Sequence, residues 1–168
     1  FEKEITTNVF RSSWAIELDR IGIANAKPKK GTGESKKAVK LSVTEKEGRV
    51  KAFFQAIFNL WQRTQQANHL TNPQPDLITI IFREDKSLAI GDKLRIDTEY
   101  NLDILALMEA LEYHKNEISL AYVAANESFL NNFSDMTALS GKLDGKLNAS
   151  HLVGLKRKML DPSFKFFR

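Results

Sequence analysis

The alternation of apolar and polar positions predicts four β-strands between residues 13 and 124. Trp14, Ile16 and Leu18 alternate with smaller or polar residues, as in a half-buried strand over 13–23. The runs "DLITIIF" (76–82) and "ISLAYVA" (118–124) predict buried strands, because they are almost wholly apolar and contain β-branched residues. The stretch "SLAIGDKLRI" (87–96) predicts a further strand that is broken or bulged at Gly91.

Helical spacing predicts two helices between these strands and a third beyond them. Thr44 and Glu47 fit a T-x-x-E capping box at the start of a helix over 44–62. Its apolar stripe, which we expect to pack against a sheet, consists of Val50, Phe53, Phe54, Ile57, Phe58 and Trp61. Asn101 is placed to cap a second helix, whose inner face would carry Ile104, Leu107, Met108 and Leu111. Residues 150–160 predict an amphipathic helix.

The order of these elements from residue 13 to 124 is β-α-β-β-α-β. This order predicts an α+β, ferredoxin-like (RRM-like) fold, with a four-stranded antiparallel sheet and two helices on one of its faces. The length of 168 residues suits a single domain over 1–168. Within it we expect 26–38, with its lysines, glycines and Pro28, to be a mobile basic loop, and 126–168 to be a C-terminal extension.

The net charge of +4 is unevenly spread along the chain. Residues 1–63 hold 13 Lys/Arg and 7 Asp/Glu, whereas residues 64–168 hold 12 and 14. This asymmetry indicates either a polyanionic partner or ordinary variation in surface charge. No apolar run approaches the roughly 20 residues that cross a bilayer, so we expect no membrane partner. The absence of cysteine excludes disulfides and thiolate metal sites and is consistent with a cytoplasmic protein.

The sequence offers little catalytic or metal-binding chemistry. Its histidines, at positions 69, 114 and 151, lack the short spacings of a zinc site, so we expect no metal and no other cofactor. The stretch "GTGES" lacks the spacing of a phosphate-binding P-loop, and no nucleophile–base arrangement stands out. We therefore expect a non-enzyme. The strand 87–96 also lacks the aromatic residues on which RNA-recognition domains stack bases, so any RNA would be held by backbone and loop contacts.

The segments "TTNVFRSSWAIELDRIG", "EKEGRVKAFFQAIFNLWQ" and "RTQQANHL" stand in that order, separated by a polar connection and followed by a strand. This arrangement resembles the backbone subunit of type I CRISPR Cascade complexes, in the DevR-like branch of the RAMP family found in type I-B systems. The likeness covers roughly residues 5–125. Because family members are considerably longer, the resemblance implies that this chain is the C-terminal portion of such a subunit.

The resemblance implies a non-catalytic protein that binds crRNA in antiviral defence. Copies of the subunit would stack along one guide RNA with other Cascade subunits and present its bases to target DNA, in the cytoplasm. Base pairing would read the sequence, while the protein grips backbone and shape. The family's best-known RNA-contacting stretch is absent here, so candidates follow from residue type near phosphates. The candidate RNA-binding residues are Arg11, Ser12, Ser13, Arg63, Gln65, Gln66, Asn68 and His69. The lysine-rich stretch 27–37 would contact RNA, target DNA or only solvent.

Two other functions stay open at this point. One is a RAMP-type endoribonuclease that processes CRISPR RNA, with His69 as its base; the glycine-rich loop of such enzymes would be represented here only by Gly141 and Gly145. The other is a ferredoxin-like module that binds proteins. Incubation with RNA separates the three functions, because it gives a cut product, a shift without cutting, or neither.

Overall fold

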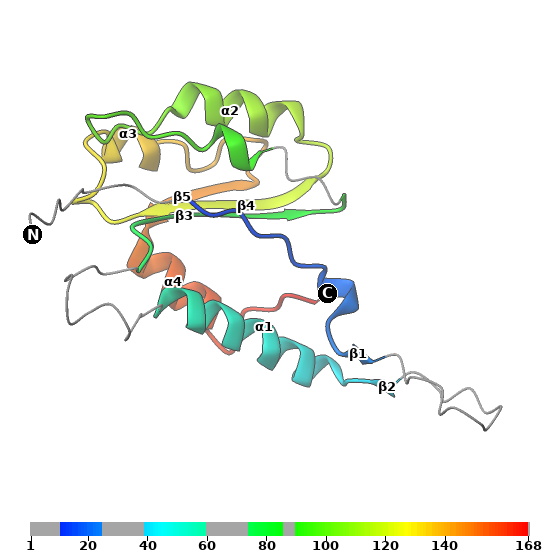
Figure 1. The fold of residues 1–168 in the computed structure, drawn as a ribbon. Coiled ribbons are helices and arrows are strands. Elements are labelled where there is room, and N and C mark those ends of the chain that lie inside the picture. The colour runs from blue at the N-terminus through cyan, green and yellow to red at the C-terminus, as the bar shows by residue number, and fades with distance from the viewer. Residues whose placement is uncertain (1–10, 25–38, 60–73, 86–89, 168) are drawn as a thin grey trace, which may run out of the picture.

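A three-stranded mixed sheet forms the centre of the computed structural model, which describes residues 11–24, 39–59, 74–85 and 90–167. Strands β3 (Leu77–Arg83) and β4 (Ile118–Ala125) are antiparallel, and β4 pairs in parallel with β5 (Leu147–His151). Helices α1 (Val43–Phe58) and α4 (Leu152–Leu160) lie on one face of the sheet, and α2 (Ile104–Tyr113) and α3 (Phe133–Thr137) on the other (Figure 1). The described chain therefore has three layers.

Strand β4 shows why both faces of the sheet are covered. Ala121 and Val123 are buried in the hydrophobic cluster on the α2 and α3 side. Tyr122 and Ala124, which point the opposite way, belong to the cluster on the α1 and α4 side. A strand buried on both faces reads as a nearly continuous apolar run, and "ISLAYVA" has this character.

The α+β class is confirmed, but the ferredoxin-like arrangement is not. The described sheet has three strands instead of four, it is mixed instead of antiparallel, and helices cover both of its faces. The main cause is residues 126–168, which we expected as an extension. They supply β5, the third strand of the sheet, as well as α3 and α4. The sequence "LNASH" of β5 is short and largely polar, and its pattern predicts no strand there.

Two of the expected strands are wrong. Residues 11–17 form no ladder, and the chain then turns through the short 3-10 helix η1 (Leu18–Arg20). A two-residue strand β1 (Ile23–Ala24) follows and pairs with β2 (Val39–Lys40), apart from the main sheet. Residues 87–89 of the expected strand 87–96 lie outside the described residues. The rest contains the 3-10 helix η2 (Gly91–Lys93) and a single bridge from Ile96 to Leu102.

Helix α1 begins one residue earlier than expected and has a different cap. The capping box is formed by Ser42 and Glu45: the Ser42 Oγ accepts from the Glu45 N–H at 3.3 Å, and the Glu45 carboxylate accepts from the Ser42 N–H at 2.9 Å. The expected partner Glu47 is buried and binds a different part of the chain. The described helix ends at Phe58, where Asn59 donates to the Gln55 carbonyl. Residues 60–62 of the expected helix, including Trp61, lie outside the described residues.

The other two expected helices are confirmed, with small shifts at their starts. Helix α2 is capped by Asp103, whose carboxylate accepts from the Ala106 N–H at 3.0 Å, whereas Asn101 binds Asp97 instead. Its residues Leu107 and Leu111 are fully buried, as the spacing predicted. Helix α4 starts two residues after Ser150 and buries Leu152, Leu155 and Met159.

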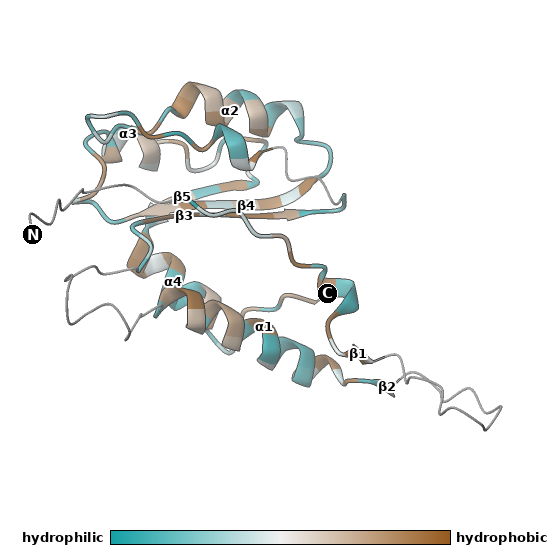
Figure 2. Cartoon of the chain, in the orientation of Figure 1, coloured by the Kyte–Doolittle hydropathy of each residue, from teal (hydrophilic) through white to brown (hydrophobic). Residues whose placement is uncertain are grey.

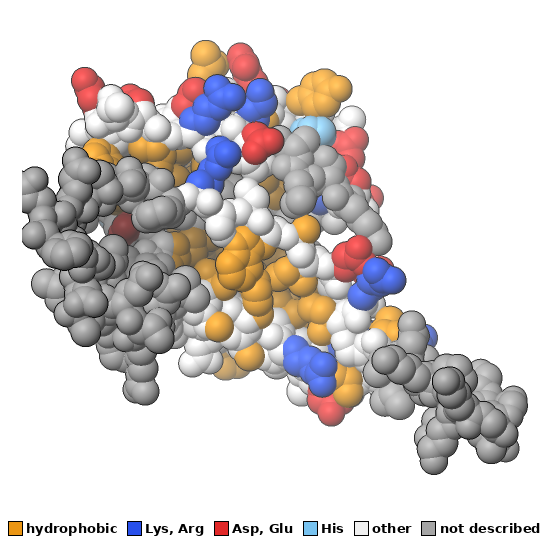
Figure 3. Space-filling view, viewed as in Figure 1, with side chains coloured by type: hydrophobic (Ala, Val, Ile, Leu, Met, Phe, Trp, Pro, Cys, Tyr) orange, Lys and Arg blue, Asp and Glu red, His pale blue; other side chains and the backbone are white. Residues whose placement is uncertain are grey.

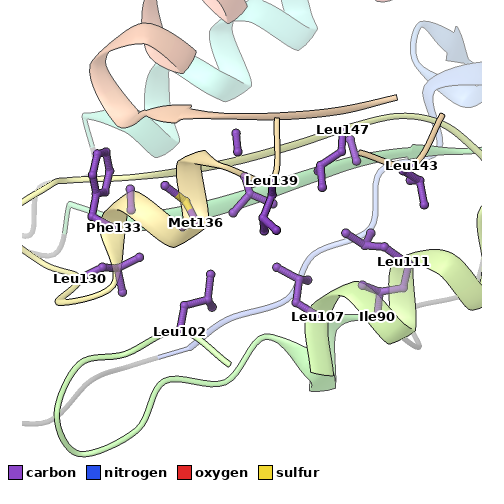
Figure 4. Packing of buried hydrophobic residues seen from close by; sticks show 14 of the residues in the cluster. Ile90, Leu102, Leu107, Leu111, Leu130, Phe133, Met136, Leu139, Leu143 and Leu147 are labelled. Carbon is purple, nitrogen blue, oxygen red and sulfur yellow. The ribbon is translucent and has the colours of Figure 1, made fainter. Parts of the chain in front are cut away.

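Each face of the sheet has its own hydrophobic cluster. On the α2 and α3 side, Leu107 and Leu111 point toward Leu102, Met136 and the sheet (Figure 4). On the other side, α1 is hydrophilic near β2 and hydrophobic toward α4 (Figure 2). The polar N-terminal half of α1 therefore forms part of the solvent-exposed surface of the molecule.

Candidate nucleic-acid interface

The structure describes three of the eight predicted RNA-binding residues, and they lie beside η2. The Arg11 guanidinium is 3.6 Å from the Asp92 carboxylate and donates to the Leu94 carbonyl at 3.3 Å. Ser12 accepts a hydrogen bond from the Trp14 indole. Ser13 lies against Gly91, where an added Cβ would meet the Ser13 Oγ at 2.8 Å. Arg11 is thus partly neutralised by an acidic neighbour.

The five remaining candidates, Arg63, Gln65, Gln66, Asn68 and His69, lie outside the described residues, as does the basic stretch 26–38. Their expected contacts with RNA stay predictions. The site formed by all eight residues likewise stays a prediction, and the surface chemistry of the described residues is considered next.

The face seen in Figure 3 is not strongly basic. Apolar side chains gather in its middle, over the segment that follows Arg11 and next to α1 (Figure 3). Trp14 and Ile16 are exposed on this segment, and the Trp14 ring lies 5.7 Å from that of Phe53. Binding of phosphate groups requires positively charged side chains, and this apolar area does not supply them.

Charge is divided between the two helical layers of the molecule. The residues 43–58 and 152–167, on the α1 and α4 side, hold seven Lys/Arg and three Asp/Glu, a net +4. The residues 90–117 and 126–146, on the α2 and α3 side, hold five Lys/Arg and ten Asp/Glu, a net −5. A polyanion is therefore attracted to the first layer and repelled by the second.

The basic layer is completed by residues 161–167, which follow α4 and are here called the C-terminal strap. The Phe166 ring stacks on Phe54 of α1, with centroids 5.3 Å apart and planes within 13°. The Lys51 ammonium donates to the Pro162 carbonyl at 3.2 Å. The Glu47 carboxylate accepts the N–H groups of Phe166 and Phe167 at 2.9 and 3.0 Å. These contacts hold the strap along α1.

Two hollows flank the strap and share Lys165 and Phe167. The first, of about 570 Å³, is also lined by Lys158, Ser163 and Phe164. The second, of about 550 Å³, lies between the strap and the N-terminal half of α1. Its other lining residues are Val43, Thr44, Glu47, Gly48, Lys51, Leu160 and Pro162. Cations beside aromatic rings are the composition that binds single-stranded nucleic acid.

Asp161 is the acidic group at the first hollow. Hydrogen bonds from the Ser163 hydroxyl and N–H, at 2.6 and 2.7 Å, lower the pKa of this carboxyl below its ordinary value, and the nearby Lys51 adds to the effect. The carboxylate is therefore ionised and occupied by Ser163. Lys158 and Lys165 are exposed and have no ion pair within the described part of the chain. The Lys158 ammonium lies 4.8 Å from the centre of the Tyr122 ring, a contact that leaves its charge unneutralised.

The sequence carries a signal for this surface that is separate from the patterns of strands and helices. The segment "LKRKMLDPSFKFF" interleaves basic and aromatic residues over α4 and the strap. Such interleaving is typical of nucleic-acid-binding surfaces. What the sequence could not give is the contact of this segment with α1, 100 or more residues away.

Other kinds of site have little support in the described residues. They contain no group of three or more His, Asp or Glu side chains placed to hold a metal ion. No helix in the described part of the chain is long and apolar enough to span a membrane. Comparison with protein-family models, with curated proteins and with solved structures found no match to this chain.

Proposed function

We propose that this chain binds single-stranded RNA through the sugar–phosphate backbone and does not cleave it. The observation that carries the proposal is the division of charge between the two helical layers, net +4 against net −5. Since the two hollows on the basic layer also present Phe164 and Phe167, that layer offers bases a stacking surface beside its cations.

The resemblance to type I Cascade backbone subunits gives this binding a biological setting. In that setting the chain is part of a crRNA-binding subunit in the cytoplasm, and copies of it assemble along the guide RNA and present it to target DNA. The exposed Trp14 and Ile16 are of the residue type that contacts between protein subunits cover. The ferredoxin-like sheet of the family would require a further strand and helices on one face only, whereas the described sheet has three strands and helices on both faces.

A gel-shift experiment on the full chain tests the proposal against both alternatives. We expect a labelled 12-nucleotide RNA to be shifted without a cut product, in EDTA as well as in Mg²⁺. A product that disappears in His69→Ala would favour the endoribonuclease. Absence of any shift at low salt would favour the protein-binding module.

A matched pair of variants locates the interface. Lys158→Ala with Lys165→Ala removes two cations of the basic layer, and Lys93→Ala with Lys142→Ala removes two exposed lysines of the acidic layer. Both pairs change the net charge equally. We expect only the first pair to weaken the shift, and equal weakening by the two pairs would contradict the location.

A further inference from the structure

The Glu47 carboxylate has one oxygen that the described chain leaves without a partner. Glu47 is only 5% exposed. Its Oε1 accepts both strap N–H groups, whereas its Oε2 is buried and has no hydrogen-bond partner. A buried acceptor without a donor is costly, and buried polar groups in native proteins nearly always have one. The oxygen therefore marks a place where a donor is missing.

The surroundings of Glu47 restrict what that donor is. Glu47 lines the second hollow together with Lys51 and Lys165. Lys51 uses one of its three N–H groups on Pro162, and Lys165 is exposed. These two ammonium groups make the lining of the hollow more favourable to an anionic molecule than to an amine or a metal cation. The site instead fits a neutral hydroxyl donor carried on a molecule that is itself anionic.

We propose that Glu47 accepts a hydrogen bond from the 2′-hydroxyl of a ribose and thereby selects RNA over DNA. This inference rests on the proposed RNA binding and names the group that the second hollow recognises. A nucleotide in an RNA strand places a 2′-hydroxyl close to two phosphates, which match the carboxylate and its two flanking lysines. DNA lacks this donor, and the 2′-hydroxyl is the group by which proteins distinguish the two.

The lining of the hollow leaves room for this approach. Gly48 has no atom within 4 Å of the position where a Cβ would stand, so the α1 surface is open there. The hollow, of about 550 Å³, is an open depression and not an enclosed pocket, as contact with an extended strand requires. Oε2 is covered in the described structure, so the proposed contact requires the groups around this oxygen to shift when the ribose binds.

Three 12-nucleotide uridine strands test the inference with the full chain: RNA, 2′-fluoro RNA and the corresponding DNA. The 2′-fluoro strand keeps a small electronegative substituent and an RNA-like sugar but cannot donate. We expect the wild-type chain to bind RNA about tenfold more tightly than either other strand, because these strands cannot form the hydrogen bond to the Glu47 carboxyl group. Equal binding of RNA and 2′-fluoro RNA would overturn the inference, and this comparison requires no variant.

The variant Glu47→Gln adds a second readout. A glutamine oxygen can still accept the two strap N–H groups, while its amide nitrogen places a donor where Oε2 stood. We expect its preference for RNA over 2′-fluoro RNA to fall below about twofold, and urea unfolding checks that it is folded. Glu127→Gln, on an exposed residue of the acidic layer, is the control and keeps the wild-type preference. A Glu47→Gln variant that keeps the tenfold preference would place the ribose contact elsewhere. If no strand binds, the proposed function itself fails.

Discussion

Replacement of Phe166 by alanine is the sharpest test of whether the C-terminal strap is part of the core. The Phe166 ring is 9% exposed and has three aromatic neighbours: Phe54 at 5.3 Å, Phe164 at 4.9 Å and Phe82 at 6.2 Å. Through these contacts it connects α1, the strap and the sheet. The strap can form the two hollows only if this packing is maintained.

The magnitude follows from the buried area. An aromatic side chain that buries about 150 Å² contributes about 4 kcal/mol at roughly 25 cal/mol per Å². Compactness of the unfolded chain and the retained Cβ reduce this value, so we expect Phe166→Ala to lower the free energy of unfolding by about 3 kcal/mol.

Urea unfolding of the full chain, followed by circular dichroism, measures this change as a lower midpoint at a similar slope. Tyr113→Ala is the control, since Tyr113 is 84% exposed and its removal should change the free energy by no more than about 0.5 kcal/mol. A decrease below about 1 kcal/mol for Phe166→Ala would show that the strap is not packed as described, and the hollows would lose their structural basis.

Three further changes test other parts of the structure. Ser42→Ala removes the α1 cap and should cost about 1 kcal/mol in urea unfolding, and an unchanged stability would contradict the capping box. The Ser42 hydroxyl and N–H lower the pKa of Glu45 below the ordinary 4.5, so this stabilisation is complete above that pH and is lost as pH falls through the lower folded value. The decrease in the free energy of unfolding between about pH 5 and pH 3 should therefore be smaller in Glu45→Gln than in the wild type. An equal decrease in the two proteins would refute this. Leu107→Ala, at a fully buried position of α2, should lower the free energy of unfolding by about 2–5 kcal/mol. A decrease below about 1 kcal/mol would contradict the packing of α2 against the sheet.

The sequence predicted those elements whose signals are local. Strands β3 and β4 are apolar runs, and α1, α2 and α4 have helical spacing, so each was found to within a few residues. Strand β5 was missed because its position is fixed by parallel pairing with β4, which stabilises a sequence as polar as "LNASH". The expected strand 13–23 failed for the converse reason: Trp14 and Ile16 alternate correctly, but no partner strand forms a ladder with them in the described residues.

The candidate site, like the fold, could be predicted only in part from the sequence. The basic residues of α1, α4 and the strap can be read from the sequence, but their gathering on one face requires the tertiary fold. Glu47 is the clearest case, because its spacing from Thr44 fits a capping box while its carboxylate actually binds the strap N–H groups, 119 and 120 residues away. The charge of Arg11 can be read from the sequence, whereas its ion pair with Asp92 depends on the fold.

The salt dependence of RNA binding tests the central claim, that the basic layer grips the RNA backbone, most directly. The association constant of the full chain for a 12-nucleotide RNA is measured at several salt concentrations for the wild type and for Lys158→Ala with Lys165→Ala. Removal of one phosphate-binding cation should reduce the slope of log K against log salt by roughly 0.7, so we predict a slope shallower by about 1.4 for an RNA of any sequence. The control pair, Lys93→Ala with Lys142→Ala, should keep the wild-type slope. An unchanged slope in the first pair, or an equal decrease in the control pair, would contradict the account.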